Sequence, residues 1–242
     1  MNINTMIRRI KRDIGIYGIA LPIDDVDKMI LEILEDTTLP VFSLYCPLEE
    51  IQHVDVSYLI HDTDLADGAD MYIIPENLIY SRKLLYVKRV AYDESYLRAN
   101  YFPSRVCMTG LDGLGDLLTA NIGKNIIDQT VNSITFKYIH PRKLLIYDAL
   151  VSSKLTIYMC FEHDKSFASI TPTSEESFYN LALLDVKAGL YPTIKHFDGI
   201  ETALGRIELK IDDWQSASAD RKELLTDWNE TYLLDAVDFD FN

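Results

Sequence analysis

Cysteine is scarce in this sequence. Its 242 residues include three cysteines, Cys46, Cys107 and Cys160, which lie far apart and form no C-x-x-C pair. An odd number of scattered cysteines offers no disulfide framework, so the pattern indicates a reducing compartment and buried, structural thiols. Long hydrophobic runs are also missing. No apolar stretch approaches the roughly 20 residues that span a bilayer, and no membrane partner is expected.

Basic residues are outnumbered. The chain has 23 Lys and Arg against 38 Asp and Glu, which gives a formal net charge of −15. A protein that grips nucleic acid needs Lys and Arg to displace the counterions of the phosphates, so this balance argues against a conventional nucleic-acid-binding face. DNA that passes along an acidic surface without sequence-specific binding remains compatible with it.

The signatures of common active sites are missing as well. Gly110, Gly113 and Gly115 match neither the dinucleotide-binding pattern nor the P-loop, and a turn before a helix explains them better. The five histidines lie in unrelated contexts, and no G-x-S-x-G nucleophile elbow occurs. We therefore expect no catalytic residues and no cofactor.

One acidic segment is a weak candidate for a metal site. Residues 62–70 carry the carboxylates of Asp62, Asp64, Asp67 and Asp70. An EF-hand would place oxygen ligands at alternate positions and glycine at the sixth, which Asp67 occupies here. A solvent-exposed acidic loop is the favoured interpretation, and weak divalent-ion binding is the alternative.

Apolar residues at helical spacing predict helices near the start of the chain. One stripe consists of Ile3, Ile7, Ile10 and Ile14. A second helix is expected over residues 24–35, where Asp24 and Asp25 suit the positive end of the helix dipole. Residues 36–40 are expected to end this helix, and residues 41–45 are expected to form a short strand.

The middle of the chain, residues 51–170, is mainly β-like. Residues 71–74 and 83–91 are strand candidates, and residues 134–138, 144–147 and 155–161 alternate between apolar and polar side chains. The last three segments predict three consecutive antiparallel strands with one buried face. Between the strand groups, residues 111–130 are expected to form a helix.

Helical patterning returns after residue 170. Thr173 and Glu176 have the spacing of a capping box, and the helix that follows is expected to stop at Gly189, before Pro192. Apolar residues from 194 to 214 predict a long helix, although residues 207–211 also alternate like a strand. A last helix is expected over residues 217–234.

These elements predict the fold class α+β, with a central antiparallel β-sheet flanked by N-terminal and C-terminal helices. No Pro-, Gly- or Ser-rich linker separates the helical region 1–50, the β-rich region 51–170 and the helical region 171–235. Residues 1–242 are therefore expected to form a single α+β domain that ends in an acidic tail, residues 235–242.

Both ends of the chain are candidates for binding a partner. The first helix has a cluster of basic residues: Arg8, Arg9, Lys11 and Arg12. The C-terminal tail combines carboxylates with aromatic rings: Asp235, Asp238, Phe239, Asp240 and Phe241. A solvated helix face and a solubilising tail are the plainer interpretation. In the other interpretation both ends are docking arms, and the tail enters a basic groove on a neighbour.

Three stretches carry a family resemblance. PRKLLIYDALVSSKLTIYMCFEHD (residues 141–164) and SFYNLALLDVKAGLYPTIKHFDGIETALGRIELKIDDWQSASADRKELLTDW (residues 177–228) resemble virion structural proteins of tailed bacteriophages, most of all head–tail connector or neck components. IDDVDKMILEILEDTTLPVFSLYCP (residues 23–47) is consistent with the same group. The resemblance implies a ring of identical subunits around a DNA channel, in contact with neighbouring virion proteins and assembled in the host cytoplasm. It implies no catalytic residues.

Several other functions stay open at this point. A baseplate or tail-completion subunit would share this composition. A metal- or carboxylate-dependent enzyme would use the loop of residues 62–70 and would lose its activity when Asp62, Asp64 and Asp67 are replaced by Asn. A host-modulating adaptor would be absent from purified particles.

Overall fold

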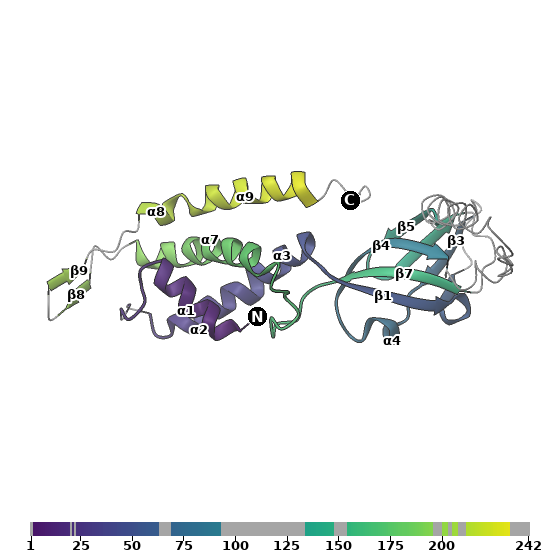
Figure 1. The fold of residues 1–242 in the computed structure, drawn as a ribbon, viewed down its shortest axis with the longest axis horizontal. Coiled ribbons are helices and arrows are strands. Elements are labelled where there is room, and N and C mark those ends of the chain that lie inside the picture. Colours follow the sequence, from purple (N-terminus) through teal and green to yellow (C-terminus); the bar gives the residue numbers. More distant parts are fainter. Residues whose placement is uncertain are drawn as a thin grey trace, which may run out of the picture. The chain divides into compact units, whose positions relative to one another are not determined.

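The computed structural model describes residues 2–19, 21, 23–62, 69–92, 134–147, 154–195, 200–202, 205–207 and 212–232. The chain forms two compact units: Met1–Leu48 together with Glu162–Asn242, and Glu49–Phe161. Helices occupy both ends of the chain and antiparallel sheets occupy the middle, so the predicted α+β class is confirmed (Figure 1). The prediction of a single domain stays a prediction, which the number of unfolding transitions would test.

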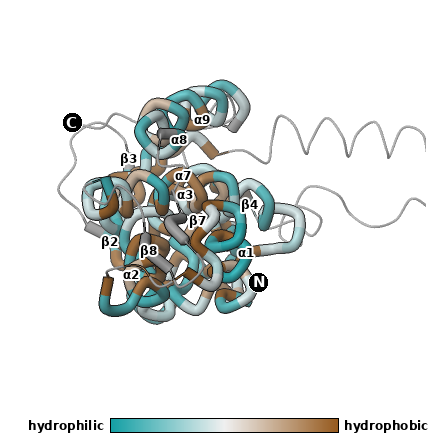
Figure 2. Tube along the Cα trace, turned by 90° about the vertical axis from the view of Figure 1, so that its left-hand side faces the viewer, coloured by the Kyte–Doolittle hydropathy of each residue, from teal (hydrophilic) through white to brown (hydrophobic). Residues whose placement is uncertain are grey.

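The first unit is a helical bundle around α7 (Glu175–Ile194). The helices α1 (Ile3–Asp13), α2 (Val26–Ile33) and α9 (Ala217–Tyr232) pack against it, and α8 (Asp212–Gln215) precedes α9. The interior face of α7 is apolar and buried: Phe178, Leu181, Ala182, Val186, Leu190 and Ile194. Figure 2 shows hydrophobic segments in the region of α7, whereas much of α9 is hydrophilic. Each fully buried large apolar side chain contributes about 1.5–3 kcal/mol of stability, so α7 organises this core.

The first helix confirms the predicted isoleucine stripe, since Ile7, Ile10 and Ile14 are buried. The Asn2 side chain accepts hydrogen bonds from the backbone N–H groups of residues 4 and 5 and caps the N-terminus. At the other end, Gly15 has φ +79°, and the N–H groups of residues 15 and 16 donate to the carbonyls of Arg12 and Lys11. This Schellman motif ends α1 and turns the chain sharply.

The predicted strand at residues 41–45 is wrong. The chain continues from α2 through a π-helical turn, η1 (Leu34–Thr38), into α3 (Leu39–Tyr45). Pro40 follows directly after the π-helical turn, in the first turn of α3, and the helix continues through it. Phe42 is fully buried in the helical core. A short apolar run fits a buried helix as well as a strand, and packing decides between them.

Helix α7 also differs from the prediction at both ends. The N-cap of α7 is Ser174 rather than Thr173, and its side chain makes no capping hydrogen bond, so the predicted capping box is wrong. The helix continues past Gly189 and Pro192 to Ile194. A Cβ atom on Gly189 would lie 2.7 Å from Ile33 Cδ1, which shows that the glycine allows α2 and α7 to approach closely rather than ending the helix.

The predicted helix over residues 194–214 is wrong too. Two short strands, β8 (Ile200–Thr202) and β9 (Gly205–Ile207), pair antiparallel within it. The C-terminal region is therefore not helical throughout. The last helix is confirmed, because α9 covers residues 217–232. The predicted helix at residues 111–130 lies outside the described residues.

The second unit contains two sheets. In the first, β1 (Leu48–Asp55), β7 (Lys154–Phe161) and β4 (Leu84–Tyr92) follow the order β1-β7-β4. In the second, β2 (Ile60–Asp62), β3 (Ala69–Ile73), β6 (Lys143–Tyr147) and β5 (Phe136–Ile139) follow the order β2-β3-β6-β5. The short helices η2 (Val56–Tyr58) and α4 (Glu76–Ile79) lie between strands.

The strands at residues 71–74, 83–91, 134–138, 144–147 and 155–161 are confirmed as β3, β4, β5, β6 and β7. Their predicted arrangement is only partly correct. β5 and β6 form an antiparallel hairpin, with Tyr138 opposite Leu144. β7, however, pairs with β4 rather than with β6. The chain thus changes sheets between β6 and β7.

A cation fastens the start of β1 inside this unit. Arg82 donates to both carboxylate oxygens of Glu50, at 2.5 and 2.6 Å, and its guanidinium lies 4.6 Å from the centre of the Phe161 ring. The hydrogen bonds from Arg82 lower the pKa of Glu50. Lys88 donates to Glu49 at 2.7 Å. Adjacent carboxylates of β1 are therefore held by cations from two other segments.

Candidate functional site

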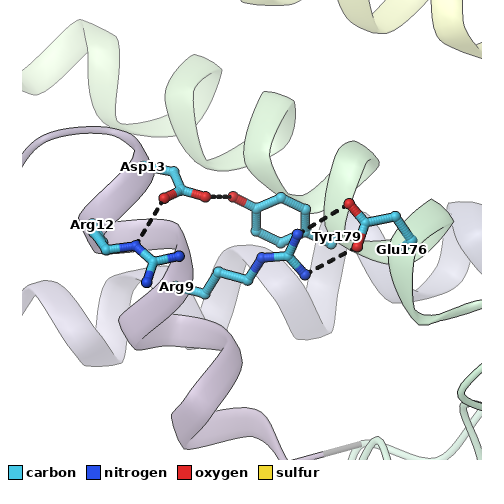
Figure 3. A network of polar contacts seen from close by, with 5 residues as sticks. All are labelled: Arg9, Arg12, Asp13, Glu176 and Tyr179. Carbon is cyan, nitrogen blue, oxygen red and sulfur yellow. Dashed lines mark hydrogen bonds and ion pairs between the residues drawn. The ribbon is translucent and has the colours of Figure 1, made fainter.

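The basic face of α1 is the candidate site, and Arg9 anchors it. The Arg9 guanidinium donates to both carboxylate oxygens of Glu176 on α7, each at 3.0 Å (Figure 3). The same guanidinium lies 3.7 Å from the centre of the Tyr179 ring. Bidentate pairing and stacking on an aromatic ring fix the plane of the guanidinium. Arg9 therefore attaches α1 to α7.

Asp13 joins the same network from the end of α1. The Tyr179 hydroxyl donates to one oxygen of Asp13, and Arg12 Nε donates to the other at 3.1 Å (Figure 3). Burial, followed by the hydrogen bond to Asp13, raises the pKa of Tyr179 to about 12. The hydrogen bonds from Tyr179 and then Arg12 lower the pKa of Asp13. The phenol thus stays protonated and the carboxylate ionised at neutral pH.

The four predicted basic residues have different roles. Arg9 is occupied by Glu176, and Lys11 donates to Asp27 on α2 at 2.7 Å. Arg12 bonds its neighbour Asp13 through Nε alone, and its side chain is 70% exposed. Arg8 is exposed and has no ion-pair partner within the part of the chain that the structure describes. Arg8 and Arg12 are therefore the cations that a partner could use.

A surface pocket of about 420 Å³ lies on this face. It is lined by Thr5, Arg8, Arg9, Arg12 and Tyr17. The turn after α1 positions Tyr17, whose side chain is 61% exposed between Gly15 and Gly18, both at φ +79°. Sequence reasoning missed Tyr17, although two nearby glycines after a predicted helix indicate a turn. The pocket combines cations with an accessible aromatic ring.

The other predicted partner-binding residues cannot be placed on this surface. Asp235, Asp238, Phe239, Asp240 and Phe241 lie outside the described residues.

The acidic segment 62–70 connects two strands. Asp62 ends β2, Asp70 belongs to β3, and Asp64 and Asp67 lie outside the described residues. His61 Nε2 lies 3.4 Å from Asp70 Oδ1, and both side chains are exposed. Within the described ranges, no three His, Cys, Asp or Glu side chains converge on one point. The suggestion of a metal site at this loop stays a prediction.

Among the described histidines, His163 comes nearest to the geometry of a catalytic histidine–serine pair. Its Nδ1 lies 2.9 Å from Ser169 Oγ, and its Nε2 lies 2.7 Å from the carbonyl oxygen of Cys46. Because a carbonyl only accepts, Nε2 carries the proton and Nδ1 accepts from Ser169. Burial lowers the pKa of His163. The ring satisfies the carbonyl at the end of α3, which is a structural role.

No described helix has the length and apolar character needed to cross a membrane. The sequence matches the family model described as "Bacteriophage ring protein" over residues 1–237. The chain belongs to this bacteriophage ring protein family and is a structural protein of a phage. No curated protein matches it. The resemblance to phage virion proteins is confirmed at this level.

Proposed function

We propose that this protein forms a ring at the neck of the phage particle, where identical subunits surround the channel through which DNA passes. The observation that carries the proposal is the family match, which covers residues 1–237 of 242. A match of this extent includes both the helical unit and the β-rich unit. Both units therefore belong to the ring-forming subunit rather than one of them being an unrelated attachment.

The charge of the chain supports a channel role. At a net charge of −15, a ring of several copies carries a large negative charge. An acidic wall repels DNA phosphates, so a genome slides past it instead of binding.

The structural role is favoured over the enzymatic alternative. In the described part of the chain, the polar clusters hold helices and strands together: Arg9 with Glu176, Arg82 with Glu50, and His163 with the end of α3. Each of these groups has its partners within the same unit. Replacing Asp62, Asp64 and Asp67 by Asn is expected to leave ring assembly and particle infectivity unchanged.

Labelling in intact particles tests the neck position. A short epitope tag on this protein, detected with gold-conjugated antibody, is expected at the junction of head and tail. Label at the distal end of the tail would assign the protein to the baseplate instead. Absence of the protein from the mass spectrum of purified particles would make it a host-directed adaptor and overturn the proposal. Fluorescently labelled duplex DNA is expected to show no retention by the purified ring at physiological salt.

A further inference from the structure

The α1 pocket has the chemistry of a site for an acidic, aromatic peptide. Arg8 and Arg12 extend from the same helix at a spacing of four residues, which places them on one face. Arg guanidinium groups bind carboxylates through paired hydrogen bonds. The exposed ring of Tyr17 and the guanidinium planes also offer stacking surfaces for another aromatic ring. A ligand that alternates carboxylates and aromatic rings would use all of these groups.

The pocket is attached to a fixed framework. Three buried residues of α1, Met6, Ile7 and Ile10, anchor its inner face. On the outer side, the Arg9 pair with Glu176 and the hydrogen bond from Tyr179 to Asp13 hold the C-terminal half of the helix to α7 (Figure 3). Binding here therefore does not require α1 to be ordered first, which lowers the entropic cost of association.

The chain itself contains a segment of matching chemistry. Its last five residues, 238–242, read Asp-Phe-Asp-Phe-Asn, and Asp235 lies shortly before them. After Lys222 the sequence has no Lys or Arg. Carboxylates and phenyl rings thus alternate in a segment with no basic residue to compete for the carboxylates.

The segment follows α9, which runs antiparallel beside α7 (Figure 1). Arg221, near the start of α9, pairs with Asp185 in the middle of α7, whereas Trp228 lies near Phe42, which packs on Phe178 close to the start of α7. The end of α9 therefore lies at the same end of the helical unit as Glu176, the partner of Arg9. The ten residues 233–242 can span at most about 33–36 Å when extended.

A ring requires two different surfaces on every subunit, because a head-to-tail contact repeats around the axis and closes on itself. The rotation that relates neighbouring subunits does not change the position of any group along the ring axis. A tail and a pocket at the same end of the helical unit can therefore meet between neighbours when the helices lie along the ring axis.

We propose that the C-terminal segment of one subunit, with Asp235, Asp238, Phe239, Asp240 and Phe241, binds the α1 pocket of the next subunit. Arg8 and Arg12 take the carboxylates, and Tyr17 takes a phenyl ring. The proposal rests on the ring assembly proposed above and assigns one of its contacts.

Charge exchange in the full-length protein tests the contact. The pocket variant is Arg8→Glu/Arg12→Glu, and the tail variant is Asp238→Lys/Asp240→Lys. Each variant alone is expected to raise the protein concentration needed for half-assembly at least 10-fold, measured by native mass spectrometry and analytical ultracentrifugation. A chain that carries all four substitutions is expected to return to within about 3-fold of the wild type, because opposite charges face each other again.

The control variant Lys28→Glu/Lys165→Glu changes the net charge by the same amount as the pocket variant. Both lysines are exposed, 71% and 67%, and line no part of the pocket. Its assembly is expected to stay within about 3-fold of the wild type. A control that assembles as poorly as the pocket variant would overturn the proposal, since net charge alone would explain the loss.

A mixture of the two variants distinguishes a neighbour's tail from the chain's own tail. If tails bind neighbours, the mixture is expected to form assemblies that contain both variants in equal number, because each tail then meets an oppositely charged pocket. If each tail binds its own chain, each variant assembles like the wild type and the mixture shows no preference for equal numbers. The second result overturns the proposal.

A peptide measurement separates failure of this contact from failure of the ring itself. A synthetic peptide of residues 233–242 is expected to bind the tail variant and to lose at least 10-fold in affinity for a chain that also carries Arg8→Glu/Arg12→Glu. Rings without peptide binding would refute the contact and leave the ring function standing. Peptide binding to a wild-type protein that stays monomeric would refute the ring function alone.

Discussion

Replacing Asp185 by Ala should loosen α9 from the helical unit. The Asp185 side chain is 1% exposed and accepts hydrogen bonds from Arg221 Nε at 2.5 Å and from Thr38 Oγ1 at 2.8 Å. One buried carboxylate therefore joins α7 to both α9 and the π-helical turn η1. Removal of one member of a buried ion pair costs about 3–5 kcal/mol because the other charge loses its partner. Arg221 is 25% exposed and regains some water, so we expect about 3 kcal/mol for Asp185→Ala.

Companion variants separate the two contacts of Asp185. Thr38→Val removes one neutral donor and should cost about 1 kcal/mol. Asp185→Asn keeps an acceptor without the charge, and its loss of stability should lie between those of Thr38→Val and Asp185→Ala. The double replacement Asp185→Leu/Arg221→Met, which exchanges the pair for apolar side chains, should cost less than Asp185→Ala alone.

Urea unfolding followed by tryptophan fluorescence measures these changes selectively. Both tryptophans of the chain, Trp214 and Trp228, are buried in the helical unit, so the signal reports that unit. With a denaturant slope of about 2 kcal/mol/M, a loss of 3 kcal/mol moves the midpoint down by about 1.5 M. An Asp185→Ala midpoint within about 0.2 M of the wild type would show that this carboxylate does not hold α9 in place.

Three further predictions concern a histidine, a glycine and a cysteine in the packed parts of the protein. Burial lowers the pKa of His163 below 6.5, so the unfolded chain binds more protons than the folded chain below that pH. The free energy of unfolding should therefore fall as the pH drops from 6.5 towards 5. In urea titrations, His163→Gln should remove most of that pH dependence. The free energy of unfolding of Gly189→Ala should lie within about 1 kcal/mol of the wild type, because only the flexible Ile33 side chain must move. Gly189→Val should lower it by about 1–3 kcal/mol, and Ile33→Val should partly restore it. Equal urea midpoints for the two Gly189 variants would contradict the close approach of α2 and α7. Burial raises the pKa of Cys160 to about 11 from 9.0, so at pH 8 its reaction with a disulfide reagent should be about 100-fold slower than that of an exposed thiol. Fast labelling of Cys160 in the folded protein, located by peptide mass spectrometry, would refute its burial.

Local patterns predicted those helices and strands whose buried face follows from the spacing of their own apolar residues. The isoleucine stripe of α1, the helix α9 and the strands β3 to β7 follow directly from spacing of three to four or of two. Residues 41–45 could not be assigned in this way, because five apolar and small residues have no distinct period. The contacts of Phe42 with Phe178 and Trp228 decide that this segment is helical.

Other errors arose because distant contacts override local signals. Gly189 and Pro192 normally end helices, yet packing of α7 against Ile33 and the rest of the core extends the helix through both. The pairing of β7 with β4 joins strands that are separated by more than half of the β-rich region, so no local pattern reveals it. Short turns, such as the one between β5 and β6, are what make pairing predictable.

The sequence predicted which basic residues make up the candidate site, but not how each of them is bonded. The sequence identified the basic cluster of α1, but it could not tell which cations are free. That distinction depends on Glu176, which lies 167 residues after its partner Arg9. Tyr17 joins the pocket only because a left-handed glycine turns the chain after α1.

Image averaging of the purified full-length protein by electron microscopy at micromolar concentration tests the ring most directly. The proposed function predicts closed particles with a single rotational symmetry and a central opening wide enough for duplex DNA. The same particles should retain their symmetry in averages of the neck of intact phages. A uniform population of monomers in solution, together with no ring density at any station of the particle, would contradict the proposed function.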